Sequence, residues 1–307
     1  MDSLSLMLKR FVHVVAGAPG SGKSRSLVRL AQVLEPEGRR VKVIDRDRGL
    51  AEAVQDLCTD EDGTLNIPGN LDYVRVKEWQ HLEDAVQDAV ENYEAGEYVC
   101  VEHLGRVWDF AQTSYTKDTL GARHSDIMNT LREQAEDEIK KAAESGGIAR
   151  TQNGRRKVVK PGDEDWNAAA DSVRRRYLGF KGLDGRLDWP LIKALHNDNI
   201  FESLINDGDF NLISTTTWNP LSKDDVDRYP EWKQFGARPN GEKEQVARHS
   251  SVVGLYKRDM GGGKLEWMWR TDFGEASKDR GHELTKDVIF SGRSYLESYA
   301  EFHGEEL

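Results

Sequence analysis

The sequence predicts an α/β fold built on a mostly parallel sheet, and three features of the chain support this. Short runs rich in Val and Ile alternate with segments whose apolar residues recur at helical spacing. A glycine-rich turn joins the first run to the first helical segment, as in folds whose ligands lie at the carboxyl ends of parallel strands. Late in the chain, two strand-like runs flank a glycine turn and predict an antiparallel hairpin at the edge of the sheet.

The first part of the chain alternates strand-like and helix-like segments. Residues 11–16 form a β-branched apolar run, which is typical of a strand buried on both faces of a parallel sheet. The helical pattern that follows stops at Pro36 and Gly38. Three more strands are expected over residues 39–47, 72–76 and 97–104, with a helix near residues 82–90 before the last one.

The alternation breaks down after residue 109, so we expect a single domain over residues 1–307 with an insertion at about 109–185. In the insertion, Ser125 is a candidate cap of a helix that ends at two glycines, and a basic loop is expected over residues 150–160. The pattern then resumes with a helix, a strand and the two strands of the hairpin. These four segments are residues 188–207, 210–218, 251–258 and 264–271.

The composition excludes several classes of protein. The chain has 43 Lys and Arg against 54 Asp and Glu, and its net charge of −11 argues against a surface that is basic throughout. Only two cysteines are present, Cys58 and Cys100, so a disulfide framework is not expected and a reducing cytoplasm is the natural setting. No run approaches the roughly 18 apolar residues of a membrane span. We therefore expect a cytoplasmic protein without a membrane partner.

The glycine-rich turn has the spacing of a Walker A motif, Gly17-x-x-x-x-Gly22-Lys23-Ser24. Glycines let the backbone fold around phosphates with its N–H groups pointing inward. Lys23 reaches the β and γ phosphates, and Ser24 supplies a hydroxyl to Mg²⁺. The sequence therefore predicts a site for a nucleoside triphosphate with Mg²⁺, and its expected contact residues are Gly17, Ala18, Pro19, Gly20, Ser21, Gly22, Lys23, Ser24 and Arg25.

Acidic residues follow two of the expected strands. Asp45 and Asp47 lie at the carboxyl end of the strand after the motif, where strand alternation places both on one side, near the γ-phosphate. The alternative is a pair of solvated loop acids. Glu102 ends the run "YVCVE", where a Walker B aspartate normally stands, and can hold the Mg²⁺ shell through water. Its alternative is the start of a polar turn.

The order of these signals resembles that of the RecA-like recombinase ATPases, in particular the short, core-only versions of bacterial and archaeal viruses. After the Walker A motif come "VIDRDRG", the Walker B run "YVCVEHLGRVW", the polar "NLISTTTW" and the stretch "GARPNGEKEQVARHSSVVGLYKR". The resemblance covers residues 10–108 and 186–280, with the insertion outside it. It implies a RecA-like P-loop fold that binds and hydrolyses ATP.

The resemblance also implies roles for single residues. Asp47 takes the place of the catalytic glutamate that orients the attacking water, and it is one methylene shorter. Thr216 or Thr217 takes the place of the sensor of the γ-phosphate. The family places ATP between subunits, which implies a ring or filament of identical chains with a basic residue acting in trans. The candidates for that residue are Lys243, Lys278 and Arg280.

Two basic clusters in the insertion are candidates for binding nucleic acid. Such clusters suit phosphate neutralisation, and nearby aromatic rings suit stacking on unpaired bases. The resemblance implies a DNA-binding loop after the Walker B strand. Acidic residues beside the first cluster leave a solvated surface as the alternative. The candidates are Arg150, Arg155, Arg156, Lys157 and Lys160 in the first cluster and Arg174, Arg175 and Arg176 in the second.

Taken together, these features predict a RecA-like ATPase that acts on single-stranded DNA in viral recombination or replication. One alternative is the ATPase subunit of a viral DNA-packaging motor, although no carboxylate cluster for a nuclease domain follows residue 280. The other alternative is a P-loop kinase of small molecules or nucleotides, in which the insertion would serve as a lid with arginines.

Overall fold

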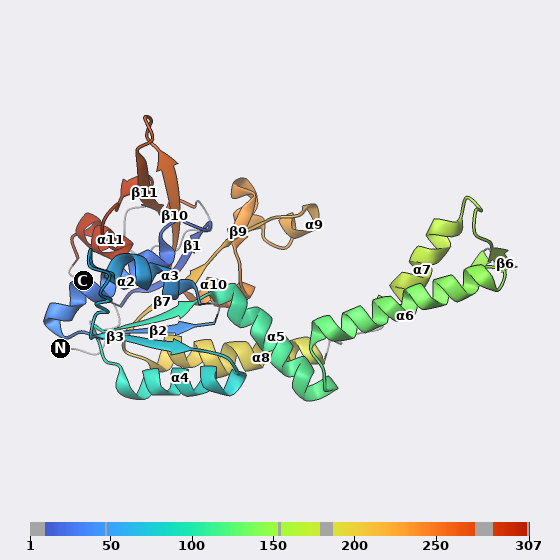
Figure 1. Cartoon of the computed structure of the whole chain (residues 1–307), viewed down its shortest axis with the longest axis horizontal. Helices are drawn as coiled ribbons and strands as arrows, with labels where there is room; N and C mark the ends of the chain where they lie inside the picture. Colours follow the sequence, from blue (N-terminus) through green and yellow to red (C-terminus); the bar gives the residue numbers. More distant parts are fainter. Residues whose placement is uncertain (1–9, 47, 153–154, 179–186, 274–284, 306) are drawn as a thin grey trace. The chain divides into compact units, whose positions relative to one another are not determined.

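The computed structural model describes residues 10–46, 48–152, 155–178, 187–273, 285–305 and 307 (Figure 1). The chain divides into two compact units. Unit 1 comprises Met1–Phe110 with Leu195–Leu307, and unit 2 comprises Ala111–Ala194. Unit 2 overlaps most of the insertion expected at about 109–185.

Unit 1 is built on an eight-stranded sheet with the strand order β12-β11-β10-β1-β7-β4-β2-β3. Every neighbouring pair from β10 to β3 is parallel, whereas β10–β11 and β11–β12 are antiparallel. The expected α/β fold, its mostly parallel sheet and its antiparallel hairpin are therefore confirmed. The strands are β1 (Val12–Gly17), β2 (Val41–Asp45), β3 (Leu71–Arg75), β4 (Tyr98–Glu102), β7 (Asn211–Thr216), β10 (Ser251–Asp259), β11 (Leu265–Arg270) and β12 (Val288–Ile289).

Helices cover both faces of this sheet. In Figure 1, α2, α3 and α11 lie on one face and α4 lies on the other. The larger helices are α2 (Lys23–Leu34), α3 (Gly49–Cys58), α4 (Trp79–Asn92), the π-helical segment η2 (Asn197–Asp207) and α11 (Tyr295–His303), while α5 (Leu104–Leu120) and α8 (Asp188–His196) have residues in both units. The shorter elements are η1 (Glu35–Glu37), β8 (Trp218–Pro220), α9 (Lys223–Val226), η3 (Pro230–Phe235), β9 (Ala237–Pro239) and α10 (Lys243–Arg248).

The main core lies between the sheet and the helices α2, α3 and α11. Val43 of β2 and Ile213 of β7 have no exposed surface, and Leu30 of α2 is equally buried. These strands are apolar at successive positions because a helix-covered parallel sheet buries both faces of each strand. Trp269 of β11 and Tyr299 of α11 close the core with ring centroids 5.3 Å apart.

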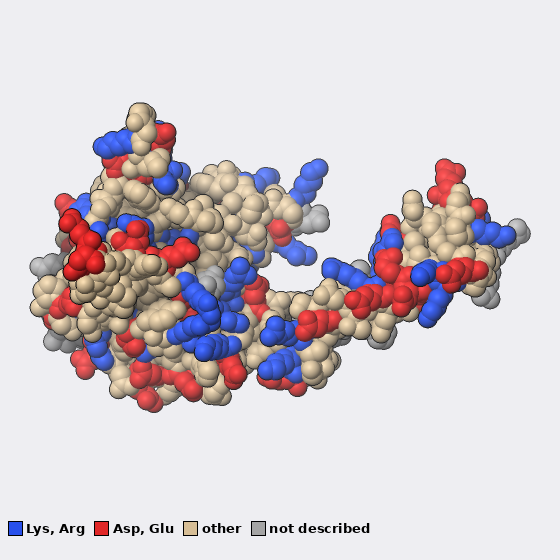
Figure 2. All heavy atoms as spheres, viewed as in Figure 1, with Lys and Arg blue, Asp and Glu red and all other residues tan. Residues whose placement is uncertain are grey.

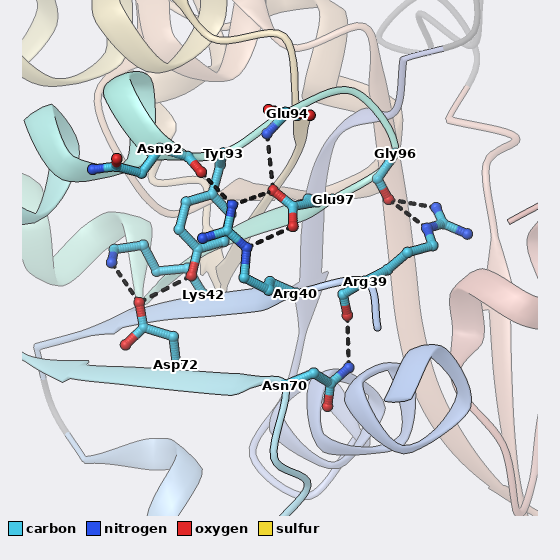
Figure 3. A network of polar contacts seen from close by, with 10 residues as sticks. All are labelled: Arg39, Arg40, Lys42, Asn70, Asp72, Asn92, Tyr93, Glu94, Gly96 and Glu97. Atoms are coloured by element: carbon cyan, nitrogen blue, oxygen red, sulfur yellow. Dashed lines mark hydrogen bonds and ion pairs between the residues drawn. The ribbon is translucent and has the colours of Figure 1, made fainter. Parts of the chain in front are cut away.

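A network of charged side chains ties β2 and β3 to α4 (Figure 3). Lys42, in the middle of β2, is 2% exposed, and its Nζ lies 2.6 Å from both Asp72 Oδ2 of β3 and Asp88 Oδ2 of α4. The hydroxyl of Tyr93 donates to Asp72 Oδ2 at 3.0 Å, and the Arg40 guanidinium stacks 4.3 Å from the centroid of the Tyr93 ring. A buried ammonium needs such partners, because an unpaired buried charge is costly.

Unit 2 has a small core of its own. It contains α6 (His124–Glu144), the hairpin of β5 (Ile148–Gln152) and β6 (Arg155–Val159), and α7 (Trp166–Leu178). The expected cap, Ser125, is not the start of α6, because the helix begins one residue earlier and Arg123 occupies the cap position. The core residues are Ile139, Ile148, Val159, Ala169, Ala170 and Val173.

The expectation of a basic loop over residues 150–160 is wrong. Residues 148–152 pair with residues 155–159 as antiparallel strands. Ile148 and Val159 face each other in the register and are buried against α6 and α7, so the apolar ends hold a hairpin whose middle is basic. The Asn-Gly pair between the two strands was the signal in the sequence, since this dipeptide favours two-residue hairpin turns.

Truncating a side chain of the central strand β7 should destabilise unit 1. Ile213→Ala should lower the free energy of unfolding by about 3 kcal/mol, because it leaves a cavity between packed strands and helices. Leu265→Ala is the control, because Leu265 is 43% exposed and should cost less than about 1 kcal/mol. Urea unfolding of both variants measures this, and equal losses would contradict the assignment of the core.

Candidate phosphate-binding site

The turn between β1 and α2 requires its glycines for backbone reasons. Gly20 and Gly22 have φ values of 76° and 95°, in the left-handed region that L side chains rarely adopt. A Cβ on Gly17 would lie 2.7 Å from the carbonyl oxygen of Leu255 and would also collide with Ser21 Oγ. The spacing of the motif is therefore the spacing that this loop geometry imposes.

The loop carries a buried positive charge and an unsatisfied hydroxyl. Lys23, at the start of α2, is 9% exposed, and its Nζ donates to the carbonyl oxygens of Gly17 at 2.7 Å and Ala18 at 3.1 Å. Ser21 Oγ is buried and has no hydrogen-bond partner among the described residues. Buried polar groups normally have partners, so the loop is suited to an anion that accepts hydrogen bonds at the start of a helix.

Glu102 lies beside this loop at the end of β4. Its Oε1 accepts a hydrogen bond from Ser24 Oγ at 3.0 Å, and its Oε2 accepts one from Thr215 Oγ1 at 2.7 Å. The carboxyl group is nearly inaccessible, with 4% of the residue exposed. The structure thus brings together Ser24 and Glu102, the two residues that the sequence singled out for Mg²⁺.

The carboxyl group of Glu102 changes its protonation state near neutral pH. Burial raises its pKa to about 7, and the carboxylate of Asp45 acts in the same direction. The hydrogen bonds from Thr215 and Ser24 and the charge of Lys23 lower the pKa and limit the rise. A cation placed next to this carboxyl group would favour its ionised form.

Of the two acids after β2, Asp45 has a local structural role. It is fully buried and accepts hydrogen bonds from the backbone N–H groups of Arg48 at 2.7 Å and Leu50 at 3.3 Å. Its Oδ2 also accepts a hydrogen bond from the hydroxyl of Tyr73 on β3 at 3.2 Å. Asp45 therefore fixes the first turn of α3. Asp47 lies outside the described residues.

The threonines at the polar end of β7 have different hydrogen-bond partners. Thr216 Oγ1 donates to the carbonyl oxygen of Asn240, whereas the neighbouring Thr215 donates to Glu102. Successive residues of a strand point to opposite faces, so only one of the two can face α2. Thr217 follows the strand, and its carbonyl oxygen accepts the N–H of Asn240 at 2.8 Å. The sequence alone does not indicate which of the consecutive threonines faces Glu102.

An indole from β11 packs on the loop, which the sequence did not indicate. Trp267 Nε1 donates to the carbonyl oxygen of Gly20 at 3.2 Å, and a Cβ on Gly22 would lie 3.0 Å from Trp267 Cδ1. A cavity of about 50 Å³ lies alongside, and Arg25, a predicted nucleotide contact, lines it and pairs with Asp56. The side of the loop away from Glu102 is therefore aromatic and basic.

The candidates for a basic residue acting in trans are only partly described. Lys243 is the first residue of α10, and its Nζ donates to the carbonyl oxygen of Arg228 at 2.9 Å. The same ammonium lies 5.1 Å from the centroid of the Tyr229 ring. Lys278 and Arg280 lie outside the described residues.

Several basic candidates of unit 2 form ion pairs within that unit. Lys157 lies 3.2 Å from Asp165, and Arg174 pairs with Glu136 and Asp171. Arg176 pairs with Glu138. Three of the remaining candidates lie on the hairpin, namely Arg150, Arg155 and Arg156. Lys160, which follows the hairpin, and Arg175 of α7 are exposed.

Comparisons of the sequence with protein-family models and with curated proteins returned no match. Within the described part of the chain, no helix combines the length and apolarity that a membrane crossing needs. The same residues hold no cluster of three or more His, Cys, Asp or Glu side chains suited to a metal.

Replacing Glu102 should change how stability depends on pH. The folded protein holds the Glu102 proton more tightly than the unfolded chain, so this contribution is complete below pH 4.5 and is lost as pH rises through about 7. Glu102→Gln cannot ionise, so its stability relative to the wild type should increase by about 2–3 kcal/mol between about pH 5 and about pH 8. Urea unfolding of both proteins at the two pH values measures this. A difference that does not vary with pH would contradict the raised pKa.

Proposed function

We propose that the chain is a RecA-like P-loop ATPase that binds ATP with Mg²⁺ and hydrolyses it. The observation that carries this proposal is the hydrogen bond between Ser24 and Glu102, directly beside the glycine loop and Lys23. A hydroxyl and a carboxylate at this distance can share the coordination shell of one hard cation. The loop supplies the matching site for the phosphates that the cation accompanies.

Each residue of the loop then has a defined task. Lys23 exchanges the carbonyl oxygens of Gly17 and Ala18 for phosphate oxygens, which are stronger acceptors because they are charged. Ser24 and Glu102 would hold the Mg²⁺ ion, and Thr215 keeps the second oxygen of Glu102 in place. Mg²⁺ would neutralise charge on the phosphate oxygens. Trp267 keeps the outer side of the loop covered.

The strand order supports the RecA-like assignment within P-loop proteins. The strand β7, whose threonines follow the expected sensor pattern, lies between β1 and β4. At its polar end, Thr215 contacts Glu102, which also binds Ser24 at the start of α2. Since Asp45 is committed to α3, Asp47 is the acid after β2 that we assign to the attacking water.

The same proposal includes an assembly of identical chains that acts on single-stranded DNA in viral recombination or replication. Lys243 is engaged with Arg228 in the same chain, so Lys278 or Arg280 is the preferred group for a neighbouring γ-phosphate. Support for DNA comes from clusters of basic residues in a chain whose net charge is −11. In a chain that is acidic as a whole, a local cluster of positive charge indicates a surface for an anionic ligand.

Removing the buried ammonium of the loop should abolish tight ATP binding. Lys23→Ala should weaken binding of a fluorescent ATP analogue by about 10- to 100-fold, because a charge-assisted hydrogen bond to phosphate is lost. Lys264→Ala is the control, since its side chain is 74% exposed on the hairpin. Fluorescence anisotropy gives both affinities. Equal affinities of Lys23→Ala and the wild type would refute the phosphate site.

Single-stranded DNA should stimulate phosphate release from ATP. If DNA assembles chains so that a basic residue acts in trans, the rate should rise by about tenfold or more. The assay compares phosphate release with and without an oligonucleotide, and adds nucleoside monophosphates in a separate reaction to detect a phosphorylated acceptor. Phosphoryl transfer to the acceptor would favour a kinase instead, and hydrolysis indifferent to DNA would remove the DNA part of the proposal.

A further inference from the structure

A basic surface of unit 1 lies at the carboxyl ends of β2 and β3 and includes none of the candidates in unit 2. Arg75 ends β3 and Lys77 follows two residues later, while Arg48 lies between β2 and α3, and all three are exposed. Tyr73 of β3 is 40% exposed among them. Figure 2 shows Lys and Arg gathered on the part of unit 1 where Figure 1 places the ends of these strands. We call Arg48, Tyr73, Arg75 and Lys77 the β3 patch.

The cations of the β3 patch are not neutralised by described carboxylates. Arg48, Arg75 and Lys77 form no ion pair with any residue that the structure describes. Asp45, a buried acid at the end of β2, accepts hydrogen bonds from two backbone N–H groups and from the hydroxyl of Tyr73. In the sequence, Asp47 lies next to Arg48 and is outside the described residues. The patch contrasts with unit 2, where Arg174 and Arg176 have carboxylate partners.

The ring of Tyr73 lies among these charges. The hydroxyl of Tyr73 and the backbone N–H of Arg48 both donate to the carboxylate of Asp45, which places Arg48 next to the ring. Burial and the carboxylate of Asp45 raise the pKa of Tyr73, whereas the charges of Arg75 and Arg48 lower it. Tyr73 and Arg75 are two residues apart on one strand and therefore share a face, about 6.6 Å apart along β3. The hydrogen bond to Asp45 holds the ring in place while leaving part of it exposed.

The patch lies on the same edge of the sheet as the phosphate loop but does not overlap it. The carboxyl ends of parallel strands meet at one edge, and β2 is separated from β1 by β4 and β7. Three strand spacings amount to about 14 Å, so an anion on the patch and a nucleotide on the loop can be bound together. Asp45 links the two regions, since it contacts Tyr73 and lies opposite Glu102 in the register of β2 and β4.

We propose that the β3 patch binds single-stranded nucleic acid, with phosphates on Arg48, Arg75 and Lys77 and a base stacked on Tyr73. Clustered cations beside a fixed, exposed aromatic ring are the combination that binds an unpaired strand without reading its sequence. Repulsion from an acidic chain would oppose such a ligand at most other surfaces, so a local patch is required. The inference deepens the DNA part of the proposed function, and it does not depend on ATP hydrolysis.

Salt-dependent binding of a fluorescent oligo(dT) tests the electrostatic half of the proposal. Arg75→Ala/Lys77→Ala should reduce the log–log salt slope by about 1.4 and weaken binding by about 20-fold at about 0.1 M salt, since each lost phosphate contact removes about 0.7. The matched control is Lys140→Ala/Lys141→Ala on α6, which removes two exposed lysines that also lack a described ion pair. It should leave both quantities unchanged.

A second pair of variants tests the stacking half. Tyr73→Leu removes the ring and should weaken oligo(dT) binding by about tenfold without changing the salt slope. Tyr73→Phe keeps the ring but loses the hydrogen bond to Asp45, and it should bind nearly as the wild type does. Affinity for a fluorescent ATP analogue should be unchanged in all these variants.

Three results would overturn the proposal. Equal affinity and slope for the patch variant and the wild type would exclude the patch. A wild-type chain that binds ATP but no oligo(dT) would refute this inference and leave the ATP site standing. Binding of polyglutamate as tight as that of oligo(dT), with no effect of Tyr73→Leu, would identify an acidic protein as the partner.

Discussion

The carboxyl group of Glu102 is the point on which the site depends. It joins β4 to the first turn of α2 through Ser24 and to β7 through Thr215, so one buried side chain sets the distance between the phosphate loop and two neighbouring strands. Burial makes the ionised form costly, and three neighbours, Thr215, Ser24 and Lys23, compensate in part. A cation at the same position would therefore favour the ionised form of Glu102 over the protonated form.

Local patterns in the sequence were sufficient for the elements whose structure depends on nearby residues. The strand, loop and helix around Lys23 could be predicted because glycine spacing and apolar periodicity are read within one window. The hairpin of β10 and β11 followed from the three glycines that separate the two strands. In contrast, the hairpin in unit 2 was missed because its paired strands are rich in charged residues, although its Asn-Gly pair was a valid signal.

Features that depend on distant residues could not be predicted. Nothing in "NLISTTTW" indicates that its strand enters the sheet between β1 and β4, because strand order is decided by packing across the whole domain. The face of each threonine depends on that position, so the sequence did not indicate that Thr215 is the one that contacts Glu102. Likewise, the capping role of Asp45 requires knowing where α3 begins. The proximity of Trp267 to the loop depends on how β11 lies beside β10.

The close approach at Gly17 has a consequence for how such a sequence can diverge. Besides Ser21 Oγ, a Cβ there would collide with the backbone carbonyl oxygen of Leu255, which every amino acid at position 255 would also present. A compensating substitution on β10 therefore cannot make room, whereas clashes between two side chains can be relieved from either partner. No substitution of a neighbouring residue removes a backbone atom, so a clash with the backbone cannot be relieved by a second substitution. At position 17 the requirement for glycine is therefore set by the backbone of β10 and not by the identity of a neighbouring side chain.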